Sequence, residues 1–145
     1  MSKKYLTPTF EAGKHLFLKN IQGSVINLNL IKLKQEADYS EYPHLKPTEK
    51  ISGWDAYFKY IKEAEPFLRA SGGEIILIGK GDQFLIGPQD EQWDICMLIR
   101  QKTVADFFNF EQDENYMKIT GHRIAAIEDS RLLPLEEVLM NTKEI

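Results

Sequence analysis

The sequence contains a single cysteine among 145 residues, so it cannot form an internal disulfide. A lone thiol fits a reducing compartment, and we expect a cytoplasmic protein. His15, His44 and His122 show no metal-ligand spacing and have no cysteine partners, so no zinc or iron site is predicted. No glycine pattern of a phosphate loop or dinucleotide site is present, and we predict no cofactor.

A cluster of positive charge and a long apolar run are also missing from the sequence. The net charge of −4 comes without the basic stripe that a nucleic-acid surface needs. No stretch reaches the roughly 20 apolar residues of a membrane helix, and residues 1–9 lack the apolar run of a signal peptide. We therefore expect neither a nucleic-acid partner nor a membrane association.

What remains is the composition of one globular domain, with 43% hydrophobic and 28% charged residues. We predict a single α+β domain over residues 1–145. A helix at about 9–20 and a loop at about 35–52 are additions to its core. The loop carries Pro43 and Pro47, and so long an irregular segment is typical of a lid or a dimer arm.

Apolar runs and helical periodicity predict the element order β-α-β-β-α-β. The expected strands cover 24–34, 74–80, 92–100 and 129–135, and the expected helices cover 53–70 and 113–127. The second strand is expected to extend through Phe84-Leu85-Ile86-Gly87. Ser52 precedes the first of these helices, whose apolar stripe runs from Trp54 to Leu68.

This order predicts a ferredoxin-like antiparallel sheet with both helices on one face, because the two crossovers have the same hand. Consecutive apolar residues, as in Ile75-Ile76-Leu77-Ile78, indicate that both faces of the sheet are buried. A second copy of the chain is the simplest cover for the helix-free face, and we predict a homodimer. The N-terminal helix is the rival cover.

Several short motifs follow the order seen in a known family. They are Asn27-Leu28-Asn29-Leu30, Ser52-Gly53 before Tyr57 and Tyr60, Gly72-Gly73, Trp93-Asp94, Tyr116, His122-Arg123 and Glu128-Asp129-Ser130-Arg131-Leu132. Over residues 24–135 the chain resembles the family called domain of unknown function 1330 (DUF1330), a member of the dimeric α+β-barrel group. Gln101-Lys102-Thr103 stand where such families often have a Pro-Ser pair. The resemblance implies a ferredoxin-like fold and a homodimer, and brings no established activity.

His122 and Arg123, on the last predicted helix, are the first candidates for chemistry. A histidine can transfer protons near neutral pH, and an arginine can hold a carboxylate. Neighbours on a helix point about 100° apart, so the two need not share a pocket. In the structural alternative, Arg123 pairs with Glu128 or Asp129 and His122 is solvated or caps backbone.

Asp94, beside Trp93, is the second candidate acid or base. Desolvation would raise its pKa; in the structural alternative it accepts backbone or arginine hydrogen bonds and sets the strand register. Asn27 and Asn29 place two amides on one face of an apolar strand, so they are either tied to neighbours or exposed to a cavity. Tyr57 belongs to the apolar stripe of its helix.

We expect any pocket to lie between the sheet and the last helix. Its predicted lining is Asn29, Trp93, His122, Arg123 and Arg131, with Tyr57 at one wall. The leading hypothesis is a homodimer that binds a small polar or aromatic molecule there. The alternatives are a cofactor-independent enzyme of isomerase, cyclase or monooxygenase type, with His122 or Asp94 as acid/base, and a dimeric interaction module without turnover.

Overall fold

The computed structural model describes residues 3–139, which form an antiparallel sheet and a layer of helices. In chain order the elements are α1 (Phe10–Leu18), β1 (Val25–Leu33), the 3₁₀ helix η1 (Pro43–Leu45), α2 (Gly53–Ala70), β2 (Glu74–Lys80), β3 (Ile95–Gln101), α3 (Val104–Glu111), α4 (Glu114–Ile119), α5 (Gly121–Ala126) and β4 (Ile127–Glu136).

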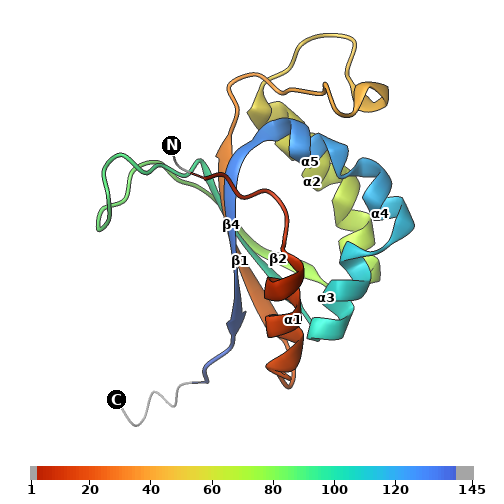
Figure 1. The fold of residues 1–145 in the computed structure, drawn as a ribbon, viewed down its shortest axis with the longest axis vertical. Helices are drawn as coiled ribbons and strands as arrows, with labels where there is room; N and C mark the ends of the chain where they lie inside the picture. The colour runs from red at the N-terminus through yellow and green to blue at the C-terminus, as the bar shows by residue number, and fades with distance from the viewer. Residues whose placement is uncertain (1–2, 140–145) are drawn as a thin grey trace.

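The four strands lie in the order β2-β3-β1-β4, and every neighbouring pair is antiparallel. All α-helices lie on one face of the sheet (Figure 1). This is the ferredoxin-like α+β topology, and the predicted fold class is confirmed. The predicted strands match the observed ones to within a few residues at each end.

Local chemistry sets the main helix boundaries. The hydroxyl oxygens of Thr9 and Ser52 accept hydrogen bonds from the N–H groups of Ala12 and Asp55, which caps α1 and α2. After α2 the chain turns at Gly72, whose φ of 87° lies in the left-handed region that glycine adopts without strain. The Ser52 cap falls at the helix start expected from sequence.

The two sheet faces differ in burial. On β1, alternate residues from Val25 to Ile31 are buried under the helices, while those between them are only half-buried. The strand register places further apolar side chains beside the half-buried ones, on the helix-free face. This face comprises Ile26, Leu28, Leu30, Leu77, Cys96, Leu98, Leu133 and Leu135. Leu77 is 50% exposed and Leu133 is 58% exposed.

Neither addition to the core covers this face. Leu16 of α1 packs with Val25, Val104 and Phe107, so α1 lies on the helix side. The 35–52 loop lies beyond the ends of α2 and α5 (Figure 1). Within residues 3–139, therefore, nothing replaces the second copy that the sequence predicts as the cover.

The predicted helix at 113–127 is wrong in extent. It is divided at Thr120 into α4 and α5, and Ile127 already begins β4. The helix α3 was not predicted, although Thr103 caps it by accepting the N–H of Asp106. That capping pattern, followed by apolar residues at helical spacing, was a readable signal.

The predicted continuation of β2 through 84–87 is also wrong. Beyond Lys80 the connection to β3 forms an isolated bridge between Gln83 and Gln92, and no strand among the described residues pairs with 84–87. Leu85 and Ile86 are almost fully exposed. Trp54, expected within the apolar stripe of α2, lies on its exposed side and stacks on Phe58.

Candidate functional site

The helix layer holds a group of polar side chains centred on Arg123 of α5. An N–H of its guanidinium donates to the carbonyl of Leu6 at 2.6 Å. Around it lie buried or half-buried polar groups from three other helices. They are Tyr57 and Tyr60 of α2, Glu111 of α3 and Tyr116 of α4, which we call the Arg123 cluster.

The tyrosines of the Arg123 cluster are packed as a unit. The hydroxyls of Tyr60 and Tyr116 are hydrogen-bonded at 2.6 Å, and the rings of Tyr57 and Tyr60 lie 5.6 Å apart. The Tyr57 hydroxyl donates to the sulfur of Met97 at 3.3 Å. The rings form an aromatic wall, and the hydroxyls line it with polar groups.

Burial decides the protonation of these groups. Burial raises the pKa of Tyr57, Tyr60 and Tyr116, and the charge of Arg123 opposes this only partly. The phenols therefore remain neutral donors at physiological pH. Burial also raises the pKa of Glu111, again against the effect of Arg123. Arg123 is therefore a permanent cation beside the neutral tyrosine hydroxyls. The carboxyl of Glu111, also near Arg123, takes up a proton more readily than an exposed glutamate does.

The helix-covered face of the sheet carries two buried amides, Asn27 and Asn29. Asn27 is 2% exposed, and its carbonyl oxygen Oδ1 has no hydrogen-bond partner among the described residues. Asn29 donates to the backbone carbonyl of Asn27 at 3.3 Å and lies opposite Met97, the residue that receives the Tyr57 hydroxyl. A buried acceptor without a donor is costly, and a bound molecule or water can supply one.

The N-terminal segment forms another side of this region. The N–H of Tyr5 donates to Asp129, and the Ser130 hydroxyl donates to the carbonyl of Tyr5 at 2.5 Å. The next residue, Leu6, receives Arg123. In Figure 1 this segment crosses from the sheet to the helices before α1 begins. Residues 5–6 thus bridge β4 and α5.

His122 faces a different part of the molecule. It is 2% exposed, and its Nδ1 lies 2.7 Å from the hydroxyl of Tyr39 in the 35–52 loop. Its Nε2 lies 3.1 Å from Oε2 of Glu63, an ion-pair distance although the pair does not meet hydrogen-bond geometry. Desolvation lowers the pKa of His122; Glu63 opposes this and Lys59 adds to it. The imidazole is therefore neutral at pH 7, and a proton on Nε2, toward Glu63, makes Nδ1 the acceptor of the Tyr39 hydroxyl.

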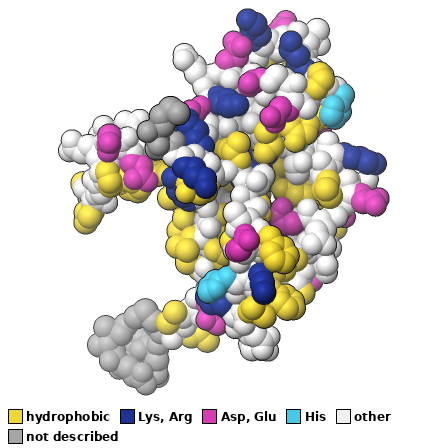
Figure 2. Space-filling model, viewed as in Figure 1, with side chains coloured by type: hydrophobic (Ala, Val, Ile, Leu, Met, Phe, Trp, Pro, Cys, Tyr) yellow, Lys and Arg dark blue, Asp and Glu magenta, His cyan; other side chains and the backbone are white. Residues whose placement is uncertain are grey.

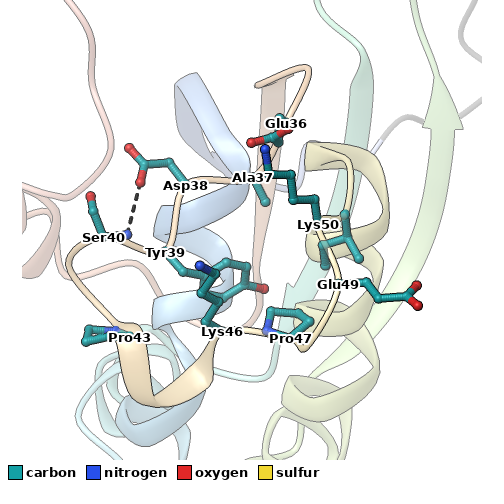
Figure 3. A pocket seen from close by; sticks show the side chains of 11 residues that line it. Glu36, Ala37, Asp38, Tyr39, Ser40, Pro43, Lys46, Pro47, Glu49 and Lys50 are labelled. Atoms are coloured by element: carbon teal, nitrogen blue, oxygen red, sulfur yellow. Dashed lines mark hydrogen bonds between the residues drawn. The ribbon is translucent and has the colours of Figure 1, made fainter.

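Tyr39 also forms part of the wall of a hollow of about 300 Å³ enclosed by the 35–52 loop. Figure 3 shows its ring at the centre, with Lys46 and Pro47 close by in projection and the Glu49 carboxylate pointing away. A hydrogen bond within the loop also stabilises it: the Asp38 carboxylate accepts the N–H of Ser40 at 3.0 Å. A smaller hollow of about 40 Å³ lies between α2 and the sheet, beside Tyr60 and Met97.

Arg131, Trp93 and Asp94 lie at a third place, near the start of β3. The Arg131 guanidinium lies over the rings of Tyr5 and Trp93, at 4.7 and 5.2 Å from their centroids, and binds Asp129 at 2.7 Å. The Asp94 carboxylate accepts the N–H of Leu33 at 2.7 Å. That contact ties β1 to β3, as in the structural alternative for Asp94.

The predicted site residues thus separate into three groups. Asn29, Tyr57 and Arg123 lie in one region, His122 in a second, and Trp93, Asp94 and Arg131 in a third. The carboxylates expected to pair with Arg123 are engaged elsewhere: Lys4 contacts Glu128, and Arg131 contacts Asp129. Five further polar residues lie in these sites but were not predicted from the sequence: Tyr39, Tyr60, Glu63, Glu111 and Tyr116. Only the spacing of Tyr60 from Tyr57 offered a signal.

Two further features of residues 3–139 bear on function. No helix in this part of the chain is long and apolar enough to cross a membrane. No group of three or more histidine, cysteine, aspartate or glutamate side chains in the same range is placed to hold a metal ion.

No protein-family model and no curated protein matches the sequence. Among solved structures, a dabb family protein with a ferredoxin-like fold from Mesorhizobium loti is 10% identical, with a TM-score of 0.45 over 81% of this chain and 99% of that one. A Bacteroides fragilis protein, described as dimeric, of unknown function and with a ferredoxin-like fold, is 16% identical, with a TM-score of 0.41 over the same shares.

A much stronger match is RPA0582, a protein of unknown function from Rhodopseudomonas palustris. Its two structures, one of them of the methylated protein, share 32% of residues with this chain and give a TM-score of 0.81. The match covers 95% of this chain and 98% or more of the other. Identity at this level over nearly both full lengths establishes common descent, so this chain belongs to the family of RPA0582.

Proposed function

We propose that this protein is a homodimer in which each copy binds a small polar or aromatic molecule at the Arg123 cluster, between the sheet and the helices. One observation carries the proposal. The Arg123 guanidinium lies beside three neutral tyrosines, and the sheet under the helices holds a buried Asn27 oxygen without a donor among the described residues. The unused donors of Arg123 and the unpaired Asn27 oxygen, beside aromatic rings, are suited to a ligand.

The hydrogen bonding of Arg123 favours a ligand-binding role over a purely structural one. A guanidinium carries five N–H donors, and the described contacts of Arg123 include one hydrogen bond, to Leu6, and no ion pair. A carboxylate or carbonyl oxygen on a ligand would use the remaining donors. Aromatic or planar groups would pack on the tyrosine rings. Small aromatic or unsaturated carboxylic acids meet both requirements.

The homodimer rests on the helix-free face of the sheet. Its eight apolar side chains form one continuous surface, and a second copy would bury it by two-fold symmetry. An open apolar face of this kind is rare on a monomer. Sedimentation velocity is expected to give twice the chain mass of 16.8 kDa. A monomer at all concentrations would contradict this half of the proposal.

The ligand half is tested by a thermal-shift screen of small carboxylic acids and their amides. We expect acids that raise the melting temperature of the wild type to lose this effect in Arg123→Gln. The matched control is Arg69→Gln on the exposed surface of α2, where the arginine contacts only Glu65 in the described part of the chain. Stabilisation that survives Arg123→Gln would remove Arg123 from the site. A screen without any hit would favour the interaction module.

Asn27→Leu provides a second test at the same site. It replaces the unpaired amide by a side chain of similar volume, so we expect the free protein to keep or gain stability. Ligand binding should weaken at the same time. A loss of stability without ligand present would mean that the amide has a structural partner.

The enzyme alternative receives less support from the same geometry. His122 is buried with both nitrogens close to protein groups, and the Asp94 carboxylate holds a backbone N–H. As acid/base groups, both would first have to break these contacts. Membership of the chain in DUF1330 remains a prediction from its sequence motifs.

A further inference from the structure

The connection between β2 and β3, residues 81–94, forms an arm that leaves the sheet on its helix-free side (Figure 1). At its tip, Leu85 is 99% exposed and Ile86 is 91% exposed. Figure 2 shows hydrophobic atoms at the end of this projection. Two large adjacent apolar side chains that are this exposed are unusual on a folded domain, and they indicate a surface made for a partner.

The arm is held in place at its base. The N–H of Gly81 donates to the carbonyl of Asp94 at 2.9 Å, and the N–H of Trp93 donates to that of Asp82 at 3.2 Å. The indole N–H of Trp93 also donates to Glu91 at 3.1 Å, and the Trp93 side chain is buried. These contacts direct the arm away from its own chain.

The tip has a defined shape as well. Gly87 has a φ of 151°, and the ring of Phe84 lies where a side chain at position 87 would stand. Phe84 therefore folds back on the turn, while Leu85 and Ile86 face outward. A preorganised apolar tip loses little conformational entropy when it binds.

The direction of the arm identifies its partner. The arm projects on the same side as the open sheet face, which the proposed homodimer covers with a second copy (Figure 1). A copy packed against that face stands beside the arm, and two-fold symmetry gives each copy one arm on the other. Charge agrees with this. The arm carries Asp82, Asp90, Glu91 and Asp94 and no cation, whereas strand alternation puts the exposed Lys32 on the helix-free side.

We propose that Leu85 and Ile86 of each copy pack against the partner copy, so that the two arms clasp the dimer. This inference rests on the proposed homodimer and adds to it a specific contact outside the sheet. It predicts that the arm contributes strongly to association and hardly at all to the folding of its own chain.

The test is sedimentation velocity over a wide concentration range on the wild type and on Leu85→Asp/Ile86→Asp. Four apolar side chains per dimer would lose their contacts, so we expect the dimer dissociation constant to rise on the order of 100-fold. The matched control is Phe17→Asp/Leu18→Asp, two exposed adjacent apolar residues of α1 on the helix side. It should change the constant by less than about threefold.

The outcomes separate the two proposals. A monomeric wild type overturns the homodimer and the clasp together. A dimeric wild type whose dissociation constant is the same in the arm variant overturns the clasp alone. Equal weakening by the arm variant and the control also overturns it, because the effect would then come from added charge. A photo-crosslinking residue at position 86 gives an independent readout, since the clasp predicts covalent dimers.

Discussion

The two long irregular connections of this molecule, residues 35–52 and 81–94, take opposite courses. The 35–52 loop is docked: the N–H of Asp38 donates to the carbonyl of Ala125, and Tyr39 is buried against His122. The 81–94 arm is anchored only at its base and holds Leu85 in solvent. Both segments contain proline, so the presence of proline does not distinguish them. The difference is whether the apolar side chains of the segment find a partner within the same chain.

The largest expected effect concerns the base of the docked loop, at Gly53. A Cβ there would overlap the carbonyl oxygen of Lys34, a backbone atom that cannot move aside alone. We expect Gly53→Ala to lower the free energy of unfolding by about 3 kcal/mol, measured by urea denaturation. The control is Gly13→Ala in α1, where nothing lies within 4 Å, and it should stabilise by about 0.5–1 kcal/mol. Equal stability of both variants would mean that the loop base is not closed as described.

The next effect concerns the hydrogen bond that joins the loop to α5. Tyr39→Phe would leave Nδ1 of the buried His122 without its donor, at a cost of about 1–3 kcal/mol in unfolding free energy. Tyr42→Phe in the same loop is the matched control, because the Tyr42 hydroxyl makes no hydrogen bond within residues 3–139. A neutral Tyr39→Phe would show that the loop docks by packing alone.

The pH dependence of stability tests the burial of His122 at the same contact. Burial lowers the pKa of His122 below 6.5 in the folded state, so below that pH the unfolded chain takes up the proton first. Stability should therefore fall as the pH is lowered from 7.5 through 6.5, and this contribution should level off below the folded pKa. His122→Gln should reduce the slope, and His15→Gln, on the exposed surface of α1, should not. Comparison of variants is needed because Glu111, whose pKa is raised, contributes with the opposite sign.

The smallest expected effect is at the tip of the arm. Leu85→Ser/Ile86→Ser should change the unfolding free energy of the monomer by less than about 0.5 kcal/mol, because neither side chain is buried by its own chain. Denaturation at several protein concentrations separates this term from dimer dissociation. A loss of several kcal/mol from the concentration-independent term would place the tip inside the fold of its own chain and remove the contrast with the 35–52 loop.

Much of the fold was predictable because it depends on local patterns. The helical period of α2, the Ser52 cap and the four apolar strands act over a few residues, and these elements form where expected, although Trp54 lies outside the buried stripe. The errors at 84–87 and at 113–127 have a common cause. An apolar run becomes a strand only if another strand pairs with it, and a helix continues only if the packing around it permits. At Gly121 a side chain would meet the rings and methyls of Tyr42 and Leu45, so the chain that packs there is distant in sequence.

The candidate site shows the same division. The sequence by itself determined that Asn29, Tyr57, His122 and Arg123 are polar groups on elements built for burial, and that adjacent helix positions point about 100° apart. Only the tertiary structure decided which neighbour each one meets. Arg123 turns to Leu6, 117 residues away, and His122 turns to Tyr39, 83 residues away. Those partners come together through the packing of separate elements, and no local pattern records such a contact, because it depends on the energy of the whole packed chain.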